Sequence, residues 1–290
     1  MKYYAPATVE EAVGLLASEP NAQVFAGATD VVPQMRGGRE APGGLVDLKK
    51  IDRCVSVTKN GDTWVIGAAA PASHLTSNAE LAGELPGMVE AAGLIGSDQV
   101  QSRSSLGGNL CNASPAADSV PGMVVNGARA VIVGANGTRT VPVEEVPSGP
   151  GRTTLADGEF VVEIEVDTPP ANTGDAYLRL IPRTEMDIAV VGAGVRVTLD
   201  GDTCTAATVA LGAVAPTVVR VPDAEAALVG STLDDATLEA VAAAASAACN
   251  PIDDKRGTIA YRQHVAGVLA KRAVGIAADR ARVINNGGGH

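Results

Sequence analysis

Aromatic side chains are scarce in this sequence. Phe, Tyr and Trp together make up 2% of the 290 residues, although 46% of the residues are hydrophobic. Alanine, valine and glycine carry most of the apolar fraction, so any core must be built from small side chains. The length is sufficient for two domains or for one large domain.

Metal-binding residues are few and scattered. The four cysteines form no CxxC pair, and only three histidines accompany them. This pattern lacks the ligand spacing of zinc and iron–sulfur sites, so no metal site is predicted. Widely spaced cysteines are typical of buried free thiols in a reducing compartment, which predicts a cytoplasmic protein. The residues concerned are Cys54, Cys111, Cys204, Cys249, His74, His264 and His290.

Catalytic motifs are also missing. The sequence has no GxxxxGK phosphate loop, no GxSxG nucleophile motif, and no pair of acids accompanied by suitable histidines. We therefore predict no catalytic residue in the chain itself. A protein with so little acid–base or nucleophilic chemistry, but with glycine turns suited to a pyrophosphate, is expected to bind a cofactor that brings its own reactivity.

The charge balance excludes another class of partner. The formal net charge is −11, with 33 acidic residues against 22 basic ones, which argues against a nucleic acid or an anionic membrane surface. No run of about 18 apolar residues is present, so membrane insertion is not predicted. The N-terminus lacks the apolar run of a signal peptide.

The glycine pair Gly107-Gly108 lies in the most distinctive segment of the sequence, between Ser105 and Asn109. Glycine has no Cβ, so the backbone here is expected to turn through positive φ and to lie close against a ligand. Consecutive free amides in such a turn would bind an anion. The alternative is a tight turn between two elements of structure, and the pair alone does not distinguish the two.

A second glycine turn lies near the N-terminus. Residues 23–26 predict a short buried strand, residues 27–30 form a Gly-Ala-Thr-Asp turn, and residues 31–36 begin like a helix. A strand, a glycine turn and a helix N-terminus form a layout that binds phosphate through free amides and the helix dipole. The alternative is an ordinary strand–helix turn in which Asp30 caps the helix.

The pattern changes after Pro169-Pro170. Residues 176–181, 188–199 and 205–214 predict three antiparallel strands, and residues 235–249 and 258–284 predict two helices. Strands followed by helices favour a small α+β domain with the helices on one face of the sheet. The tail after Ile284 is expected to be disordered.

Five segments in this order resemble the FAD-binding medium subunit of the molybdenum hydroxylases, the family of xanthine dehydrogenase and carbon monoxide dehydrogenase. The resemblance runs from Tyr4 to about Val283. The segments are Phe25–Asp30, Ser105–Asn109, Pro115–Asp118, Tyr177–Ala189 and Ile252–Arg256, the last followed by Tyr261-Arg262.

The resemblance implies an α+β fold. Residues 1–172 would form a two-subdomain FAD-binding fold of the PCMH type, with subdomains of about 1–54 and 55–172. Residues 173–284 would form a C-terminal domain with a three-stranded antiparallel sheet and a helical bundle. Residues 285–290 would be a disordered tail.

The resemblance also implies a set of cofactor contacts. The loop from Ala26 to Asp30 would hold the pyrophosphate, and Ser105–Asn109 would contact the pyrophosphate and the flavin side. Asp118 would bind the adenosine ribose or a neighbouring loop. Ile95 would pack against the cofactor, and the backbone of Val161 would meet the ring. Arg179 and Asp187 would lie at the flavin edge, and Ile188 would lie over one ring face. The implied set is Ala26, Gly27, Ala28, Thr29, Asp30, Val31, Ile95, Ser105, Gly107, Gly108, Asn109, Asp118, Val161, Arg179, Asp187 and Ile188.

The implied role is electron transfer. A large molybdopterin subunit would oxidise the substrate, a small subunit with two [2Fe–2S] clusters would pass the electrons to FAD, and an external acceptor would receive them. The assembly would be a dimer of three-subunit units. FAD is expected to be non-covalently bound, because the first loop has no histidine or cysteine. The alternatives are a free-standing flavin oxidoreductase of related fold and a non-catalytic assembly protein.

Several positions depart from the family pattern. Ala28 stands where many relatives have a second glycine, which makes the backbone conformation of the loop more demanding. Arg179 stands where relatives often have lysine, which keeps the charge but changes the geometry. The Gly-Gly-His-Ser version of the first loop, typical of one carbon monoxide dehydrogenase branch, is absent, which makes carbon monoxide a less expected substrate.

Overall fold

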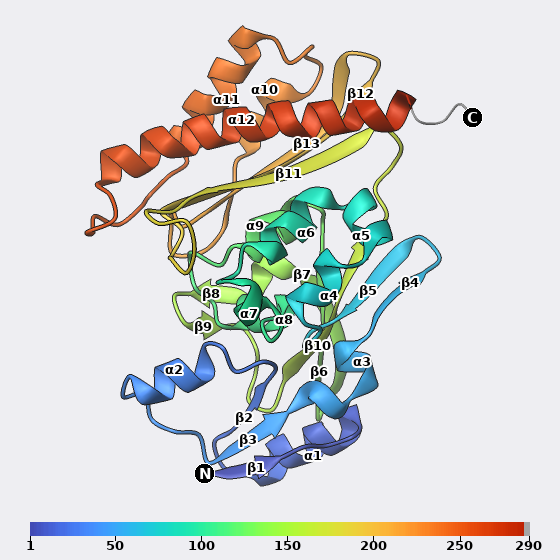
Figure 1. The fold of residues 1–290 in the computed structure, drawn as a ribbon, viewed down its shortest axis with the longest axis vertical. Helices are drawn as coiled ribbons and strands as arrows, with labels where there is room; N and C mark the ends of the chain where they lie inside the picture. The colour runs from blue at the N-terminus through green and yellow to red at the C-terminus, as the bar shows by residue number, and fades with distance from the viewer. Residues whose placement is uncertain (287–290) are drawn as a thin grey trace.

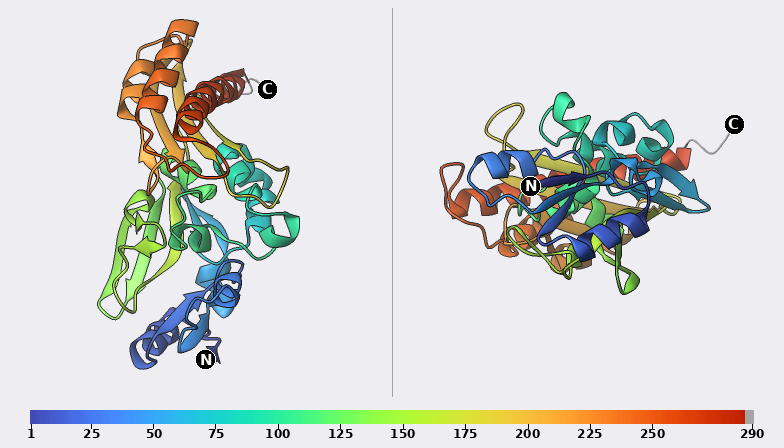
Figure 2. Two further views of the ribbon diagram at one scale, coloured as in Figure 1. Left: turned by 90° about the vertical axis from the view of Figure 1, so that its left-hand side faces the viewer. Right: turned by 90° about the horizontal axis from the view of Figure 1, so that it is seen from below.

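The computed structural model describes residues 1–286 and shows three lobes stacked along the long axis of the molecule (Figure 1). The N-terminal lobe lies at one end, the C-terminal lobe at the other, and a middle lobe connects them; the left view of Figure 2 shows the same order. Each lobe has its own β-sheet, and in each the hydrophobic core lies against that sheet.

The N-terminal lobe has a three-stranded parallel sheet in the order β1-β3-β2. Thr8 caps the first helix, because its Oγ1 accepts a hydrogen bond from the Glu11 amide. The Glu11 carboxylate reaches back as in a capping box, but it accepts from the amide of Ala7, the residue before the cap. The elements are β1 (Lys2–Tyr4), α1 (Val9–Ser18), β2 (Ala22–Phe25), α2 (Val31–Arg36), β3 (Gly44–Asp47), the 3-10 turn η1 (Leu48–Lys50) and α3 (Asp52–Val55).

The middle lobe has a five-stranded antiparallel sheet in the order β4-β5-β10-β6-β7, and short helices cover it. The strands are β4 (Val57–Asn60), β5 (Thr63–Gly67), β6 (Arg129–Gly134), β7 (Gly137–Pro142) and β10 (Phe160–Asp167), with the small pair β8 (Pro147–Gly149) and β9 (Arg152–Thr153) beside them. The helices are α4 (Ala72–Thr76), α5 (Ala79–Glu84), α6 (Pro86–Gly93), α7 (Asp98–Gln101), α8 (Leu106–Cys111), α9 (Ser119–Val125) and the 3-10 turn η2 (Val143–Glu145).

The C-terminal lobe confirms the α+β prediction and extends it. The three predicted strands are present, and a fourth, two-residue strand joins them in the antiparallel order β11-β12-β13-β14. One helix, α10, precedes the two that the sequence predicts. The elements are β11 (Thr173–Leu180), β12 (Val191–Asp200), β13 (Thr203–Gly212), β14 (Val219–Arg220), α10 (Pro222–Leu228), α11 (Asp235–Ala247) and α12 (Ile259–Asn286).

The expectation of disorder is wrong for residues 285 and 286, because α12 continues to Asn286. The rest of that expectation, residues 287–290, lies outside the described residues.

Small side chains let the long helix α12 lie close to the sheet. Its buried positions are mostly alanines, among them Ala270, Ala277 and Ala281. A Cβ added to Gly174 in β11 would stand 2.2 Å from the Ala277 carbonyl oxygen, so the strand and the helix meet backbone to backbone. The predicted core of small side chains is therefore confirmed in the C-terminal lobe.

The other face of the C-terminal sheet rests on the middle lobe. A Cβ on Gly87 in α6 would come within 2.6–2.8 Å of the Ala176 backbone. The buried carboxylate of Asp175 accepts hydrogen bonds from the amides of Gly87 and Met88, both at 3.0 Å, and from Asn126 Nδ2 at 2.7 Å. A side chain of one lobe thus satisfies the free amides at a helix start in the next, which fixes the two lobes together.

Candidate cofactor site

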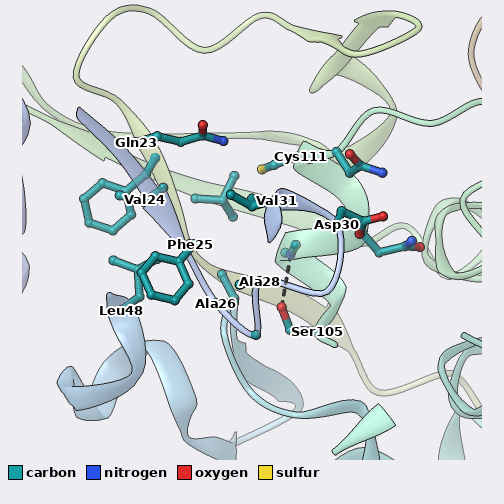
Figure 3. Close-up of a pocket in the computed structure, with 18 of the residues that line it drawn as sticks. Gln23, Val24, Phe25, Ala26, Ala28, Asp30, Val31, Leu48, Ser105 and Cys111 are labelled. Carbon is teal, nitrogen blue, oxygen red and sulfur yellow. Dashed lines mark hydrogen bonds between the residues drawn. The ribbon is translucent and has the colours of Figure 1, made fainter. Parts of the chain in front are cut away.

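A cavity of about 680 Å³ lies between the N-terminal and middle lobes. Such a volume is typical of sites for cofactors and other small molecules. The strand β2 and the loop after it form one side, and α8 forms the other (Figure 3). The two glycine segments that the sequence singles out therefore face each other across one space.

The first loop is held by an unusually close backbone contact. A Cβ on Gly27 would stand 1.7 Å from the carbonyl oxygen of Arg103, so only glycine fits there. The next residue, Ala28, has a φ of +60°. This is the left-handed region, which costs an alanine about 1–2 kcal/mol. The demanding backbone expected at Ala28 is confirmed.

The amides of this loop are available to a ligand. None of the five consecutive N–H groups from Gly27 to Val31 donates a hydrogen bond to any residue in the range 1–286. The ordinary-turn alternative requires the Asp30 side chain to cap α2, and Asp30 forms no such capping hydrogen bond. Its carboxylate is exposed to the cavity, where the surrounding loops partly desolvate it and raise its pKa. A row of free amides is the arrangement that binds an anion.

The second glycine segment has a different role from the one expected. Ser105 caps α8, and its Oγ accepts a hydrogen bond from the Gly108 amide at 3.1 Å. The amides of Gly107 and Asn109 are also occupied, by the carbonyls of Ala68 and Ser105. Neither glycine has a positive φ. The expectation of a left-handed turn with free amides is wrong here, because the segment is helical and its donors are already used.

Close approach explains these glycines instead. A Cβ on Gly107 would stand 2.5 Å from the Ala68 Cβ and 2.6 Å from the Ala68 oxygen. A Cβ on Gly108 would meet only the Ser105 Oγ, at 3.1 Å, and Gly108 lines the cavity. Gly107 therefore packs against Ala68, the residue after β5, while Gly108 leaves the cavity open.

Most of the predicted site residues come together at the cavity. Twelve of the sixteen line it: Ala26, Gly27, Ala28, Thr29, Asp30, Val31, Ile95, Ser105, Gly107, Gly108, Asn109 and Val161. Within the described residues, the side-chain oxygen of Asn109 accepts hydrogen bonds from the Ser119 amide and hydroxyl, at 3.2 Å and 2.7 Å. It therefore fixes the start of α9.

The other four predicted residues do not line the cavity. Asp118 and Arg179 pair with each other at the contact between the middle and C-terminal lobes, with Nη1 of Arg179 donating to Asp118 at 2.6 Å. Asp187 and Ile188 lie in the loop between β11 and β12. The Met186 amide of that loop donates to the Gly96 carbonyl at 3.4 Å, which places the loop next to the Ile95 wall.

Four residues of the cavity wall, most of them polar, were not predicted from the sequence. Gln34, Arg39, Cys111 and Asn112 all line the cavity. The Gln34 amide donates to Asn112 Oδ1 at 2.8 Å, which joins α2 to the residue after α8. No motif marks these residues; only the pairing of the two lobes brings them together. Desolvation raises the pKa of the Cys111 thiol to about 12, so the thiol stays protonated and is a poor nucleophile.

No group of three or more His, Cys, Asp or Glu side chains among residues 1–286 could hold a metal ion. In the same range, no helix has the length and apolar composition needed to span a bilayer.

Two family models cover nearly the whole chain. The model described as the FAD binding domain in molybdopterin dehydrogenase matches residues 1–169. The model described as the CO dehydrogenase flavoprotein C-terminal domain matches residues 176–277. The chain belongs to the FAD-binding subunits of the molybdenum hydroxylases. The resemblance read from the five segments is thus confirmed.

Relatives of this flavin subunit are similar over their full length. The carbon monoxide dehydrogenase medium chain of Hydrogenophaga pseudoflava is 34% identical over 277 residues, covering 95% of this chain and 96% of the relative. The xanthine dehydrogenase FAD-binding subunit of Escherichia coli O157:H7 is 28% identical over 274 residues, covering 94% of each.

Solved structures of such proteins share the fold. A chain of carbon monoxide dehydrogenase from Hydrogenophaga pseudoflava superposes with a TM-score of 0.93 at 36% identity, covering 97% of this chain and 98% of that one. A chain of quinoline 2-oxidoreductase from Pseudomonas putida 86 gives a TM-score of 0.91 at 27% identity, with the same coverage.

The cavity fits FAD. The five free amides from Gly27 to Val31 suit a diphosphate, and the side chain missing at Gly108 leaves room beside them. The protonated Cys111 thiol does not favour a covalent bond to the flavin. This flavin subunit is therefore the FAD-binding component of a molybdenum-dependent oxidoreductase.

Proposed function

We propose that this subunit takes electrons from the [2Fe–2S] clusters of a small subunit, after a large molybdopterin subunit has oxidised the substrate, and releases them to an external acceptor. The observation that carries the proposal is the character of the cavity wall. Among the described residues that line it there is no histidine and no lysine, whereas five lining residues, Gly27 to Val31, have amides that donate to no acceptor within residues 1–286. A wall without these side chains, and with free amides suited to a diphosphate, favours the binding of an electron-carrying cofactor over acid–base chemistry on a substrate.

The residues of the cavity divide the work of holding FAD, which when bound supplies one- and two-electron chemistry. The loop from Ala26 to Val31 binds the diphosphate through its amides. On the opposite wall, Ser105 caps α8, and the missing side chain of Gly108 lets the cofactor approach the helix backbone. Ile95 and Val161 supply apolar contacts to the ring system.

The C-terminal lobe closes this arrangement from outside the cavity. Asp187 and Ile188 lie in the loop that reaches Gly96, and we place them at the exposed side of the ring. Asp118 and Arg179 act on the cofactor indirectly, by fastening the lobes to each other. We also place the domain boundary at residues 172/173, where the chain enters β11.

We further propose a cytoplasmic dimer of heterotrimers. All four cysteines are free thiols, as expected in a reducing compartment. The substrate meets the large subunit, so the residues described here do not select it.

Co-expression with the neighbouring large and small subunits tests the proposal. We expect the three chains to purify together with one FAD in each copy of this one. Removal of the small subunit should abolish reduction of the flavin by substrate while the FAD content stays unchanged. Reduction that persists without any partner would instead support a free-standing flavin oxidoreductase, and a colourless protein that does not take up added FAD would support a non-catalytic role.

A further inference from the structure

The cavity wall has an unbalanced charge. Its described lining contains two acids, Asp30 and Glu159, and a single cationic side chain, Arg39. Glu159 is already compensated, because Nε and Nη2 of Arg139 donate to its two oxygens at 3.0 Å and 2.7 Å. Asp30 forms no ion pair with any residue of the described chain, and desolvation raises its pKa. A diphosphate with two negative charges that enters this cavity therefore meets one uncompensated acid and one cation.

Arg39 is positioned for this anion by the turn after α2. Gly38 has a φ of +98°, which reverses the chain, and the Arg39 amide donates to the Gln34 carbonyl at 3.0 Å. The guanidinium Nη1 then donates to Gln34 Oε1. Gln34 in turn donates to Asn112 across the cavity rim. The guanidinium is thus held over the junction of the two lobes by a neutral amide.

No carboxylate within residues 1–286 pairs with this guanidinium, and its side chain is exposed. One of its five N–H donors is used by Gln34, and the fork geometry of the others suits a phosphate. The Gln34 amide is neutral, whereas a phosphate brings an opposite full charge to the guanidinium. The remaining donors of Arg39 are therefore available to an anion in the cavity.

We infer that Arg39 is a cofactor-contacting residue that neutralises the diphosphate of FAD, and that Gln34 and Asn112 hold it at the rim until the cofactor arrives. This inference rests on the binding of FAD in the cavity. It assigns to one exposed arginine, beside the amides of the first loop, part of the discrimination between flavins that carry phosphate and those that do not.

The experiment compares FAD with riboflavin, which has the same ring system but no phosphate. Full-length chain stripped of flavin is titrated with each, and quenching of flavin fluorescence gives the affinities. Arg39→Ala should lower the FAD affinity by about 10- to 30-fold and the riboflavin affinity by less than about twofold. Arg39→Lys should restore part of the loss. Added salt should weaken FAD binding less in Arg39→Ala than in the parent protein.

Arg36→Ala is the matched control, since Arg36 is the last residue of α2, three residues before Arg39, but does not line the cavity. It should bind both flavins as the parent does. Unchanged FAD affinity in Arg39→Ala would overturn the inference, as would an equal loss of both flavins, which would mean that Arg39 only supports the lobe contact. A parent protein that binds neither flavin would instead refute FAD binding in the cavity, and the inference with it.

Discussion

Nη1 of Arg179 lies 2.6 Å from the Asp118 carboxylate in the contact between the middle and C-terminal lobes. Both side chains are at least nine-tenths buried, and the Tyr177 hydroxyl donates to the second Asp118 oxygen at 2.9 Å. Burial raises the pKa of Asp118, and Arg179 and Tyr177 partly oppose that shift. The contact between the two lobes therefore contains a buried Asp118 carboxylate whose negative charge is stabilised by Arg179.

Removal of the cation should destabilise the fold and change its pH dependence. Arg179→Ala leaves a buried carboxylate without its counter-charge, which costs about 3–5 kcal/mol in the free energy of unfolding. The variant should recover stability as the pH falls, because folded Asp118 then binds a proton more readily than unfolded Asp118 does.

Urea denaturation between pH 5 and 8 measures this effect. The double variant Arg179→Met, Asp118→Asn is the control, because it removes both charges and should regain most of the lost stability. Equal destabilisation of the single and double variants would show that the ion pair itself is not the cause.

Replacing Ala28 with glycine should increase the stability of the protein. With a φ of +60°, it occupies a region in which glycine has no steric penalty. Ala28→Gly should raise the stability of the flavin-free protein by about 1 kcal/mol, after the greater flexibility of unfolded glycine is subtracted. Thermal unfolding should show a higher midpoint. Ala26→Gly, in the same loop but without a positive φ, should lower it; a rise of the same size in both would argue against relief of strain at Ala28.

The adjacent glycines of α8 should fail in different ways. Gly107→Ala places a Cβ about 2.5 Å from the Ala68 Cβ and should cost about 1–3 kcal/mol of stability. Gly108→Val projects a branched side chain at the cavity wall and should abolish FAD retention while the protein stays folded. Circular dichroism and the flavin content of the purified variants separate the two outcomes, with Gly108→Ala as the conservative control. Full flavin occupancy in Gly108→Val would show that this part of the wall does not face the cofactor.

The contrast between these loops shows what local sequence can reveal. The strand–turn–helix order around Gly27 follows from local patterning, and it correctly predicts free amides. Around Gly107 the same residue type has another reason, contact with Ala68, a residue 39 positions earlier in the chain. Glycine marks a place where a side chain cannot fit, but the sequence does not say what occupies the space.

Long-range pairing explains the remaining differences. Asp118 and Arg179 are both recognisable as site candidates, yet only the docking of β11 on the middle lobe shows that they bind each other. Arg39 has no motif, because its position depends on the turn at Gly38 and on a neighbour from the other lobe. The two-residue strand β14 is too short to leave a periodic pattern.

Cys111 offers a direct probe of where the cofactor lies. It is half-buried and lines the cavity, whereas Cys54, Cys204 and Cys249 are buried elsewhere in the chain. Desolvation raises the pKa of its thiol to about 12, so alkylation of the flavin-free protein by iodoacetamide should be slow at neutral pH. Its rate should rise about tenfold for each pH unit up to about pH 10, because the thiolate fraction rises tenfold.

Saturating FAD should block the reaction, because the cofactor then covers the wall at α8. Peptide mass mapping identifies the labelled residue, and Cys111→Ser is the control that should take up no label. Equal labelling of Cys111 with and without bound FAD would mean that the cofactor does not reach this wall of the cavity.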